Sequence, residues 1–484
     1  MLITKPADVD PTSPEPIELA QPLLDQLAAT RTAALATLAA GAPVYGVNTG
    51  MGALSKVRLT AAEQAVHQRN LLLARAVGGP PWLDPTETRA VLLARLRTLL
   101  AGDPAVSVEL IHHLVAFINS GQLPQIPASG AGSAGEIIPL AHAMTPLVTG
   151  AEEGPSPRIE PAERTAPAAL GGGAGGDEEA DRPEASFALG PKEGIALLAG
   201  IPGATGRAAL HASRARRLAD HLTCVAAGAI AVVRANRGPY SELAGRGDEV
   251  LAGELGRLRE LAGVEGEPRG LQAAVSFRVA GQVGAYVRRA IGDLDDAVER
   301  AFAGVMDSPA YLGGEFVGTA GFHGIELTAY CDHLVSALAH AAEVSAARLH
   351  RLLDPAVTGL NAQLAFVPGP QAGLVAVHKR AVATTHRLRR CALPTGIGTV
   401  ETSNGQEDVQ SFSWEAVGNL GEAIRLAREV TACELLAVYQ AHLLAKRPLP
   451  PGLLQATADV VPPIEADRPF GQDLTRLLET VLAP

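Results

Sequence analysis

Arg278 is the residue whose setting most directly suggests chemistry. It lies in an otherwise apolar run, residues 272–283, where a cation would need a partner. A planar guanidinium matches a carboxylate through two parallel hydrogen bonds, so we interpret Arg278 as a clamp for a substrate carboxylate. The structural alternative, a salt bridge to an internal acid, stays open.

Two further side chains could deprotonate or orient a substrate. Tyr45 lies in the glycine-rich segment 44–54, which is expected to form a loop over a site. A phenol acts as a base near neutral pH only where its surroundings stabilise the phenolate. Arg75 is a poor base but a good clamp for a carboxylate or phosphate. The alternatives are a tyrosine that packs on the core and an arginine at a helix end in solvent.

An acid and an amide stand together at Gln406-Glu407-Asp408, between two predicted helices. Such a run can cap a helix, but acids and amides also gather where helix ends meet at a site, and we favour that interpretation. Upstream, small residues at 128–135 allow a tight turn before a helix predicted to start at Glu136. The carboxylate of Glu136 would then lie in the first helical turn, where the helix dipole favours it.

Seven motifs resemble those of the histidine/phenylalanine ammonia-lyase family, in the family's order and over roughly residues 40–440. They are Tyr45–Gly52, Asn70–Gly78, Gly132–His142, Lys192–Gly200, Gln272–Val283, Ala320–Gly324 and Ser403–Asp408. In the family, an Ala-Ser-Gly triad within the third motif cyclises and dehydrates to the electrophile methylidene-imidazolone (MIO). Here the aligned triad is Ser133-Ala134-Gly135, and alanine has no hydroxyl to leave as water. The chain therefore resembles a divergent member, for which we expect no MIO and no other cofactor.

Two alternative triads stay open. Ala128-Ser129-Gly130 is a literal match, but its glycine stands five residues before Gly135 and would start the following helix in the wrong place. Gly132-Ser133-Ala134 requires one inserted residue, and it puts alanine where ring closure favours glycine.

The resemblance also assigns roles to single residues. It implies Tyr45 and Glu407 as catalytic groups, and the substrate-binding residues that we predict with it are Arg278, Arg75, Asn48, Gln272, Phe322 and Gln406. Three family side chains that support or exploit MIO are replaced here by Ala199, Val275 and Gly321. The electrophile and its supports are lost together while the carboxylate clamp is kept, which favours a rebuilt site over random decay.

Composition favours packed helices, and the resemblance implies a mainly α fold, a long-helix bundle of the ammonia-lyase and fumarase/aspartase-like type. Apolar residues recur at helical spacing over 62–78, 85–101, 205–235, 280–305, 324–353, 371–392 and 414–446. We predict an N-terminal domain at 1–200, which includes a flexible insertion at 150–188. A central long-helix bundle with C-terminal helices is predicted at 201–484.

Bulk properties exclude several functions. A net charge of −11 argues against nucleic-acid binding, and four cysteines without a Cys-x-x-Cys spacing indicate no metal site. Neither a signal peptide nor an apolar run of about 18 residues is evident, which predicts a cytoplasmic protein with no membrane partner. The resemblance implies a homotetramer.

These observations predict a MIO-independent enzyme that performs acid–base chemistry on a small carboxylate, by elimination, addition, isomerisation or cyclisation, in specialised metabolism. Ordinary deamination of histidine or phenylalanine is not expected. Two alternatives remain. One is an inactive homologue that acts as a binding or partner subunit, and the other is a true aromatic amino acid or histidine ammonia-lyase with a shifted triad.

Overall fold

The computed structural model describes residues 1–150, 187–264 and 266–483, so the insertion predicted at 150–188 lies almost wholly outside the described residues. The described chain is mainly helical, as predicted, and divides into two compact units. Unit 1 consists of Met1–Leu210, Ala297–Thr328 and Thr395–Gly418, and unit 2 of His211–Asp296, Ala329–Pro394 and Asn419–Pro484. Two segments that the sequence placed in a second domain, 297–328 and 395–418, thus belong with the N-terminal part of the chain.

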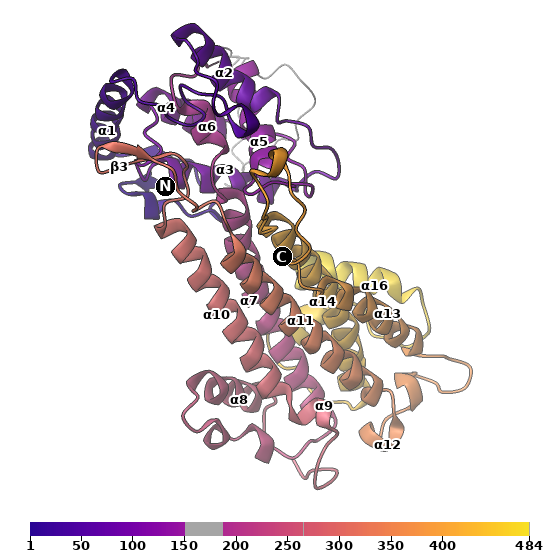
Figure 1. Cartoon of the computed structure of the whole chain (residues 1–484). Coiled ribbons are helices and arrows are strands. Elements are labelled where there is room, and N and C mark those ends of the chain that lie inside the picture. The colour runs from indigo at the N-terminus through magenta and orange to yellow at the C-terminus, as the bar shows by residue number, and fades with distance from the viewer. Residues whose placement is uncertain (151–186, 265, 484) are drawn as a thin grey trace, which may run out of the picture. The chain divides into compact units, whose positions relative to one another are not determined.

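A helix is present at each stretch of apolar spacing (Figure 1). These helices are α2 (Ala61–Leu73), α3 (Pro85–Leu99), α7 (Pro202–Val232), α10 (Ala280–Ala303), α11 (Ile325–Leu352), α13 (Val375–Cys391) and α14 (Ser413–Leu444). Local polar groups fix where they begin. The backbone N–H of Thr60 donates to Glu63 Oε2 at 2.7 Å, and the backbone N–H of Glu63 donates to Thr60 Oγ1 at 3.4 Å, which is a capping box at the start of α2.

Unit 1 also contains shorter elements. They are β1 (Leu2–Ile3), η1 (Pro6–Asp8), β2 (Glu18–Leu19), α1 (Gln21–Ala39), η2 (Gly52–Leu54), α4 (Val108–Asn119), α5 (Ile137–Thr149), α6 (Glu193–Leu198), β3 (Ala310–Leu312), β4 (Glu315–Val317) and η6 (Ser403–Gly405). Strands β1 and β2 pair in parallel, whereas β3 and β4 form an antiparallel hairpin. Its turn uses Gly313 and Gly314 at φ +59° and +90°, a conformation that other residues adopt rarely.

Unit 2 is built on the long helices. Its other elements are η3 (Gly238–Tyr240), η4 (Glu242–Gly245), α8 (Glu249–Leu261), α9 (Val275–Arg278), α12 (Pro355–Thr358), η5 (Ala362–Leu364), α15 (Leu453–Val460), α16 (Phe470–Arg476) and η7 (Leu477–Val481). A Cβ added to Gly421 would lie 2.8 Å from His211 Nε2, and one added to Gly228 would lie 2.8 Å from Val438 Cγ1. The two contacts advance together along the chain, so α7 and α14 run parallel and pack closely where glycine leaves room.

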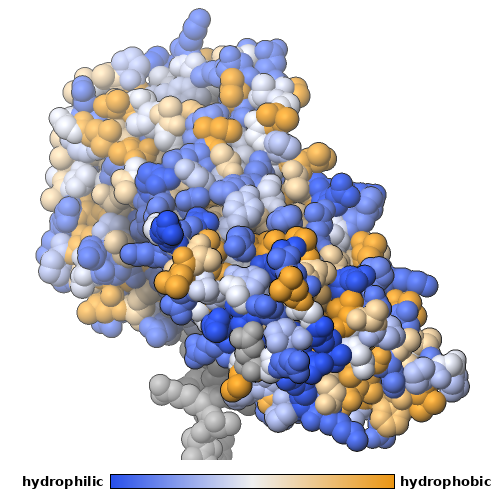
Figure 2. All heavy atoms as spheres, turned by 90° about the horizontal axis from the view of Figure 1, so that it is seen from below, coloured by the Kyte–Doolittle hydropathy of each residue, from blue (hydrophilic) through white to orange (hydrophobic). Residues whose placement is uncertain are grey.

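The surface carries no unusual apolar concentration on the face that Figure 2 displays, where apolar and charged residues are intermixed. Single exposed apolar side chains are normal on folded proteins. Within the described residues, no helix has the length and hydropathy required to span a membrane. The four cysteines are free thiols.

Candidate active site

The loop that carries Tyr45 is held in place by two helices of unit 1. Gln68 of α2 donates from Nε2 to the carbonyl of Gly46 at 3.0 Å and accepts from the backbone N–H of Ile195 at 3.2 Å. Gly46 has φ +67°, and a Cβ there would lie 2.4 Å from Ile195 Cδ1. Glycine is therefore required at this position for the loop to pack on α6.

The phenol oxygen of Tyr45 accepts a hydrogen bond from the backbone N–H of Gly52 at 2.8 Å. Such a donor stabilises negative charge on the oxygen, which is what a phenolate base requires. Asn48, predicted to bind substrate, is buried and uses its amide within the loop. It accepts from the N–H of Val44 at 2.7 Å and donates to the carbonyl of Ala42 at 2.8 Å. Asn48 thus shapes the loop rather than presenting its amide to a ligand.

Arg75 follows α2 and is half-buried beside the same loop. Its Nη1 donates to the carbonyl of Leu71 at 3.3 Å, and its Nη2 lies 3.9 Å from Met51 Sδ. Burial lowers the pKa of Arg75, while charge on Tyr45 and Glu407 acts in the opposite direction, so both groups lie within Coulombic reach of the guanidinium. Among the described residues, Arg75 forms no ion pair with a carboxylate, which leaves donors available for an anion.

Glu407 binds the segment that aligns with the MIO triad. Its Oε2 accepts from the backbone N–H of Ala134 at 3.0 Å and from Thr402 Oγ1 at 3.4 Å, and its Oε1 accepts from Ser403 Oγ at 3.1 Å. Ser133 Oγ donates to the carbonyl of Gly135 at 2.9 Å. Unit 1 therefore brings Tyr45, Arg75, Glu407 and the triad into one neighbourhood.

Glu136 does not lie in the first turn of its own helix, contrary to the sequence-based expectation. It precedes α5 and is fully buried, and its two oxygens accept from the backbone N–H groups of Gly203 and Ala204, each at 2.8 Å. It therefore caps α7, a helix some 70 residues later. Burial raises the pKa of Glu136 to about 8, although the two N–H donors favour the charged form.

A buried charged cluster fixes the turn that faces the triad. Arg95 donates to the carbonyls of Ala196, at 3.0 Å, and Ala199, and Lys192 pairs with Asp307 at 2.7 Å. The backbone then turns at Gly200, whose carbonyl lies 3.1 Å from the position of a Cβ on Gly135. Phe322, predicted to bind substrate, lies 3.5 Å from that same position through its own Cβ.

Gly321 cannot carry a side chain in this backbone. A Cβ there would lie 1.8 Å from the carbonyl oxygen of Val305 and 3.1 Å from Met306 Cα. The asparagine that the motif of the resembled family has at this position would not fit. The local backbone, and not just one side chain, therefore differs from what the motif implies.

Comparison with known proteins identifies the family. Residues 6–462 match the family model described as aromatic amino acid lyase. This chain belongs to the aromatic amino acid lyase family. Histidine ammonia-lyase of Symbiobacterium thermophilum is 30% identical over 455 residues, which cover 91% of this lyase homologue and 87% of that protein. Histidine ammonia-lyase of Sorangium cellulosum is 28% identical over 492 residues, with coverage of 96% and 93%.

Solved structures confirm the mainly α lyase fold. Ergothionase from Treponema denticola, solved with desmethyl-ergothioneine sulfonic acid, superposes with a TM-score of 0.87 at 21% identity, covering 99% of this chain and 98% of that one. Tyrosine aminomutase from Streptomyces globisporus gives a TM-score of 0.85 at 22% identity, covering 99% and 95%. At these identities the likeness concerns the fold alone.

The residues of this aromatic amino acid lyase homologue do not fit MIO at the aligned triad. Ala134 supplies no hydroxyl, and its backbone N–H is bonded to Glu407 as in an ordinary peptide. Ala199 offers a methyl group in place of an amide, and its carbonyl is taken by Arg95. Gly321 has no room for the amide that the motif would supply.

The remaining predicted residues are placed as follows. Gln406 is exposed in unit 1, next to Glu407, and Gln272 is exposed in unit 2. Arg278 ends α9 in unit 2 and is half-buried. Val275, at the position of the second active-site tyrosine in the resembled motif, is 59% exposed. The prediction of a carboxylate clamp at Arg278 therefore concerns unit 2, whereas Tyr45, Arg75 and Glu407 belong to unit 1.

One residue of the neighbourhood escaped the sequence analysis. His67 of α2 has a buried Nε2 without a hydrogen-bond partner among the described residues. Burial lowers the pKa of His67, and the charge of Arg75 lowers it further, so the imidazole is held neutral near the guanidinium. The separation of the two residues in the sequence could have identified His67, because it precedes Arg75 by about two helical turns and so lies on the same side of the segment.

Proposed function

We propose that this lyase-family protein is an enzyme that works without MIO and performs acid–base chemistry on a small carboxylate. One observation carries the proposal. The triad position is an alanine whose N–H is bonded to Glu407, while Tyr45 and Arg75 remain assembled beside it. The groups needed to move a proton and to hold an anion are therefore present where the groups needed for the electrophile are not.

Each candidate residue has its own role in the proposed reaction. Tyr45 takes or gives the proton, because the N–H of Gly52 and the charge of Arg75 both stabilise a phenolate oxygen. Arg75 orients an anionic group of the substrate through the donors that it does not use internally. Arg278, in unit 2, is proposed separately as a group that holds a carboxylate. Elimination, addition, isomerisation and cyclisation each require this proton transfer, and so the proposal covers all four.

One contact favours a second candidate, a MIO lyase with the shifted triad Gly132-Ser133-Ala134. In that triad the ring-closing nitrogen is that of Ala134, and its N–H already donates to a carboxylate, Glu407, at 3.0 Å. Against it, Ser133 Oγ is bonded to the carbonyl of Gly135. The mass of the intact protein separates the two candidates, because MIO formation removes two waters and the proposed function requires the unmodified mass.

Assembly and location complete the proposal. We propose a homotetramer in the cytoplasm, with no nucleic-acid partner. The free state of all four cysteines supports this location, because cytoplasmic thiols stay reduced.

Replacing Tyr45 by phenylalanine tests the mechanism. The protein is incubated in D2O with histidine, tyrosine and phenylalanine, and with the acrylic acids that loss of ammonia from these amino acids would give. Deuterium incorporation is followed by mass spectrometry. Y45F should lower exchange at least about a hundredfold, the usual contribution of a general acid or base. Y311F is the matched control, since the Tyr311 hydroxyl bonds to Thr37 Oγ1 at 3.2 Å in the same unit. Equal exchange in Y45F and wild type would overturn the mechanism.

A further inference from the structure

Glu407 lies in a loop that has few means of holding its own shape. None of the residues 399–409 is buried, and Ser403 and Asn404 both have positive φ, +54° and +55°. Residues other than glycine adopt this left-handed conformation at a cost. Two backbone hydrogen bonds close the turn, from the N–H of Thr402 at 2.8 Å and from the N–H of Glu407 at 3.3 Å. The position of Glu407 therefore depends on groups outside this turn.

Gln410 directly follows the loop and is buried, with 3% of its surface exposed. Its Oε1 accepts from Thr399 Oγ1 at 2.5 Å and from the backbone N–H of Val400 at 3.2 Å. Its Nε2 donates to the carbonyl of Glu407 at 3.0 Å. This one side chain thus joins the start of the loop to the residue that carries the carboxylate.

The partners of Gln410 fix the orientation of its amide. A backbone N–H can only donate and a backbone carbonyl can only accept, so the oxygen faces Val400 and the nitrogen faces Glu407. Turning the amide by half a rotation would set two acceptors against each other at Glu407 and two donors at Val400. A side chain of similar size without this pair of groups therefore cannot replace the glutamine.

The backbone next to Gln410 is held by the start of α11 in the same unit. Ser411 is buried, its Oγ accepts from the backbone N–H of Gly324 at 3.0 Å, and its carbonyl accepts from Thr328 Oγ1 at 2.8 Å. A Cβ added to Gly324 would lie 2.9 Å from Ser413 Cβ, so the two segments are in close contact. Gln410 therefore connects the exposed loop to a fixed part of unit 1.

We propose that Gln410 is a positioning residue, which holds Glu407 within reach of the backbone N–H of Ala134. Through Glu407 it fixes the triad segment beside Tyr45. The inference deepens the proposed function, because it names the residue that sets the geometry of the site. It rests on that function only for the claim that a loosened Glu407 lowers turnover.

Amide hydrogen exchange of the full chain, measured by mass spectrometry on peptides that cover 130–136, tests the inference. Q410M keeps the approximate size of the side chain and removes its donor and its acceptor. Amide exchange at Ala134 should rise about fivefold, which corresponds to the loss of one neutral hydrogen bond.

Q440M is the matched control. Gln440 is also a buried glutamine, and its Nε2 donates to the carbonyls of Leu364 at 3.3 Å and Ile464 at 3.0 Å in unit 2. Q440M should lower the melting temperature of the protein, because it removes comparable bonds, but it should leave amide exchange at 130–136 unchanged.

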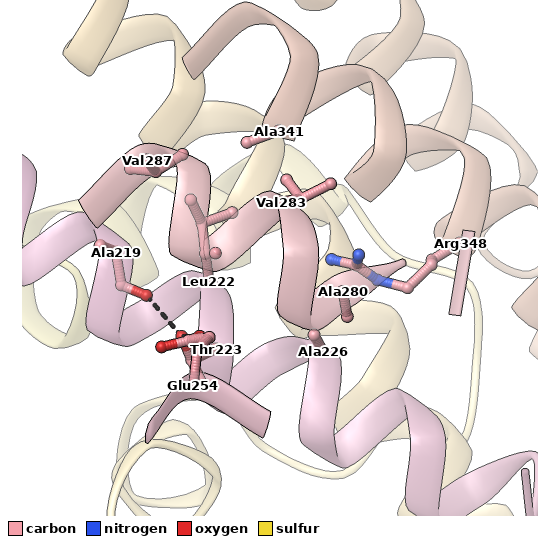
Figure 3. Close-up of a pocket in the computed structure, with 11 residues that line it drawn as sticks. Ala219, Leu222, Thr223, Ala226, Glu254, Ala280, Val283, Val287, Ala341 and Arg348 are labelled. Atoms are coloured by element: carbon pink, nitrogen blue, oxygen red, sulfur yellow. Dashed lines mark hydrogen bonds between the residues drawn. The ribbon is translucent and has the colours of Figure 1, made fainter. Parts of the chain in front are cut away.

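A milder pair of variants covers the case in which Q410M does not fold. T399V removes one of the two donors to Gln410 Oε1, so amide exchange at 130–136 should rise about twofold. Its control is T223V in unit 2. The dashed line in Figure 3 marks the bond from Thr223 Oγ1 to the carbonyl of Ala219, at 2.9 Å, beside a cavity of about 20 Å³. T223V should leave amide exchange at 130–136 unchanged.

A double mutant separates positioning from a general loss of stability. E407A alone should raise amide exchange at Ala134 about tenfold. Because Gln410 acts through Glu407, E407A/Q410M should give the same increase, whereas independent effects would multiply to about fiftyfold.

Q410E makes the positioning depend on pH. A protonated carboxyl has one O–H donor and an acceptor oxygen and can replace the amide, whereas a carboxylate has no donor for the carbonyl of Glu407. Burial raises the pKa of the introduced carboxyl, which keeps it protonated in mild acid. Compared with wild type at the same pH, amide exchange at 130–136 should be near normal at about pH 5 and about fivefold higher at about pH 8.5. A side chain that only fills space would not restore protection in acid.

Three results would each overturn the inference. They are equal amide exchange at 130–136 in Q410M and Q440M, multiplied effects in the double mutant, and no recovery of Q410E in acid. Turnover is followed separately as deuterium incorporation into the small molecules, which Q410M should lower about fivefold. Raised amide exchange with unchanged turnover would overturn the link between the position of Glu407 and the reaction.

Y45F distinguishes this inference from the proposed function. It should abolish deuterium incorporation and leave amide exchange at 130–136 intact. An active Y45F would overturn the proposed function, while the positioning of Glu407 by Gln410 would stand.

Discussion

Replacing Glu407 by alanine should release the triad segment. Glu407 is the acceptor for the backbone N–H of Ala134 at 3.0 Å, and the same carboxylate accepts from Ser403 at 3.1 Å and from Thr402 at 3.4 Å. One side chain thus joins residues 402–407 to the triad. Without it, the amide of Ala134 would open to solvent more often.

The size of the effect follows from these contacts. A hydrogen bond to a charged group contributes about 1.5–3 kcal/mol, and the half-buried setting of Glu407 argues for the lower end. Since 1.4 kcal/mol corresponds to a factor of ten, amide exchange at Ala134 should rise about tenfold. The bonds at 3.1 and 3.4 Å stabilise residues 402–403 instead, and so exchange in that segment should rise as well.

Hydrogen exchange measured by mass spectrometry, on peptides that cover 130–136 and 398–410, provides the readout. D408A is the matched control, since Asp408 is the exposed neighbour of Glu407 and should leave exchange unchanged. Equal exchange in E407A and wild type would refute the reasoning. That result would mean that the carboxylate does not hold the triad and is free to serve as an acid or base.

Two further predictions concern stability. Burial, with repulsion from Asp307, raises the pKa of Asp103 to about 6, so its ionised form is disfavoured in the fold, and stability falls as pH rises from about 4 through 6. D103N should remove this loss, with a gain of up to about 3 kcal/mol at pH 7.5 and none at pH 4 in denaturant titrations; parallel pH curves would contradict it. G321N should destabilise the fold by about 3 kcal/mol or more, because its Cβ would meet Val305. G318N is the control, since nothing lies within 4 Å of a Cβ at Gly318, and equal melting temperatures for the two variants would contradict the steric argument.

The helices could be predicted because their signal is local. Apolar residues at 3–4 spacing mark the buried face of each helix, and a cap such as Thr60 with Glu63 fixes its start within a few residues. The sequence proposed Tyr45, Arg75 and Glu407 as members of a site through the order of the motifs and not through spacing. The comparisons confirm the family and the fold on which that inference depended.

Contacts between distant segments were not predictable in the same way. Nothing near Glu136 in the sequence indicates that its carboxylate caps α7 through Gly203 and Ala204. The steric limit at Gly321 likewise arises from the path of the chain at Val305, which only the folded backbone defines. Segments 297–328 and 395–418 join unit 1 for the same reason, because compactness is set by contacts and not by order along the chain.

The pattern of replaced and retained residues argues for a ligand. Two of the three replaced supports are packed into their surroundings, since the carbonyl of Ala199 bonds to Arg95 and Gly321 packs directly on Val305. The two retained cations have not been neutralised by their surroundings. Arg75 and Arg278 are half-buried, and neither is paired with a carboxylate among the described residues. A half-buried cation without an anion lowers stability, so drift toward an inactive scaffold would be expected to neutralise or expose it. This chain keeps two such cations although the polar side chains that support MIO in the family are replaced. Binding of an anionic ligand at each cation would account for their retention.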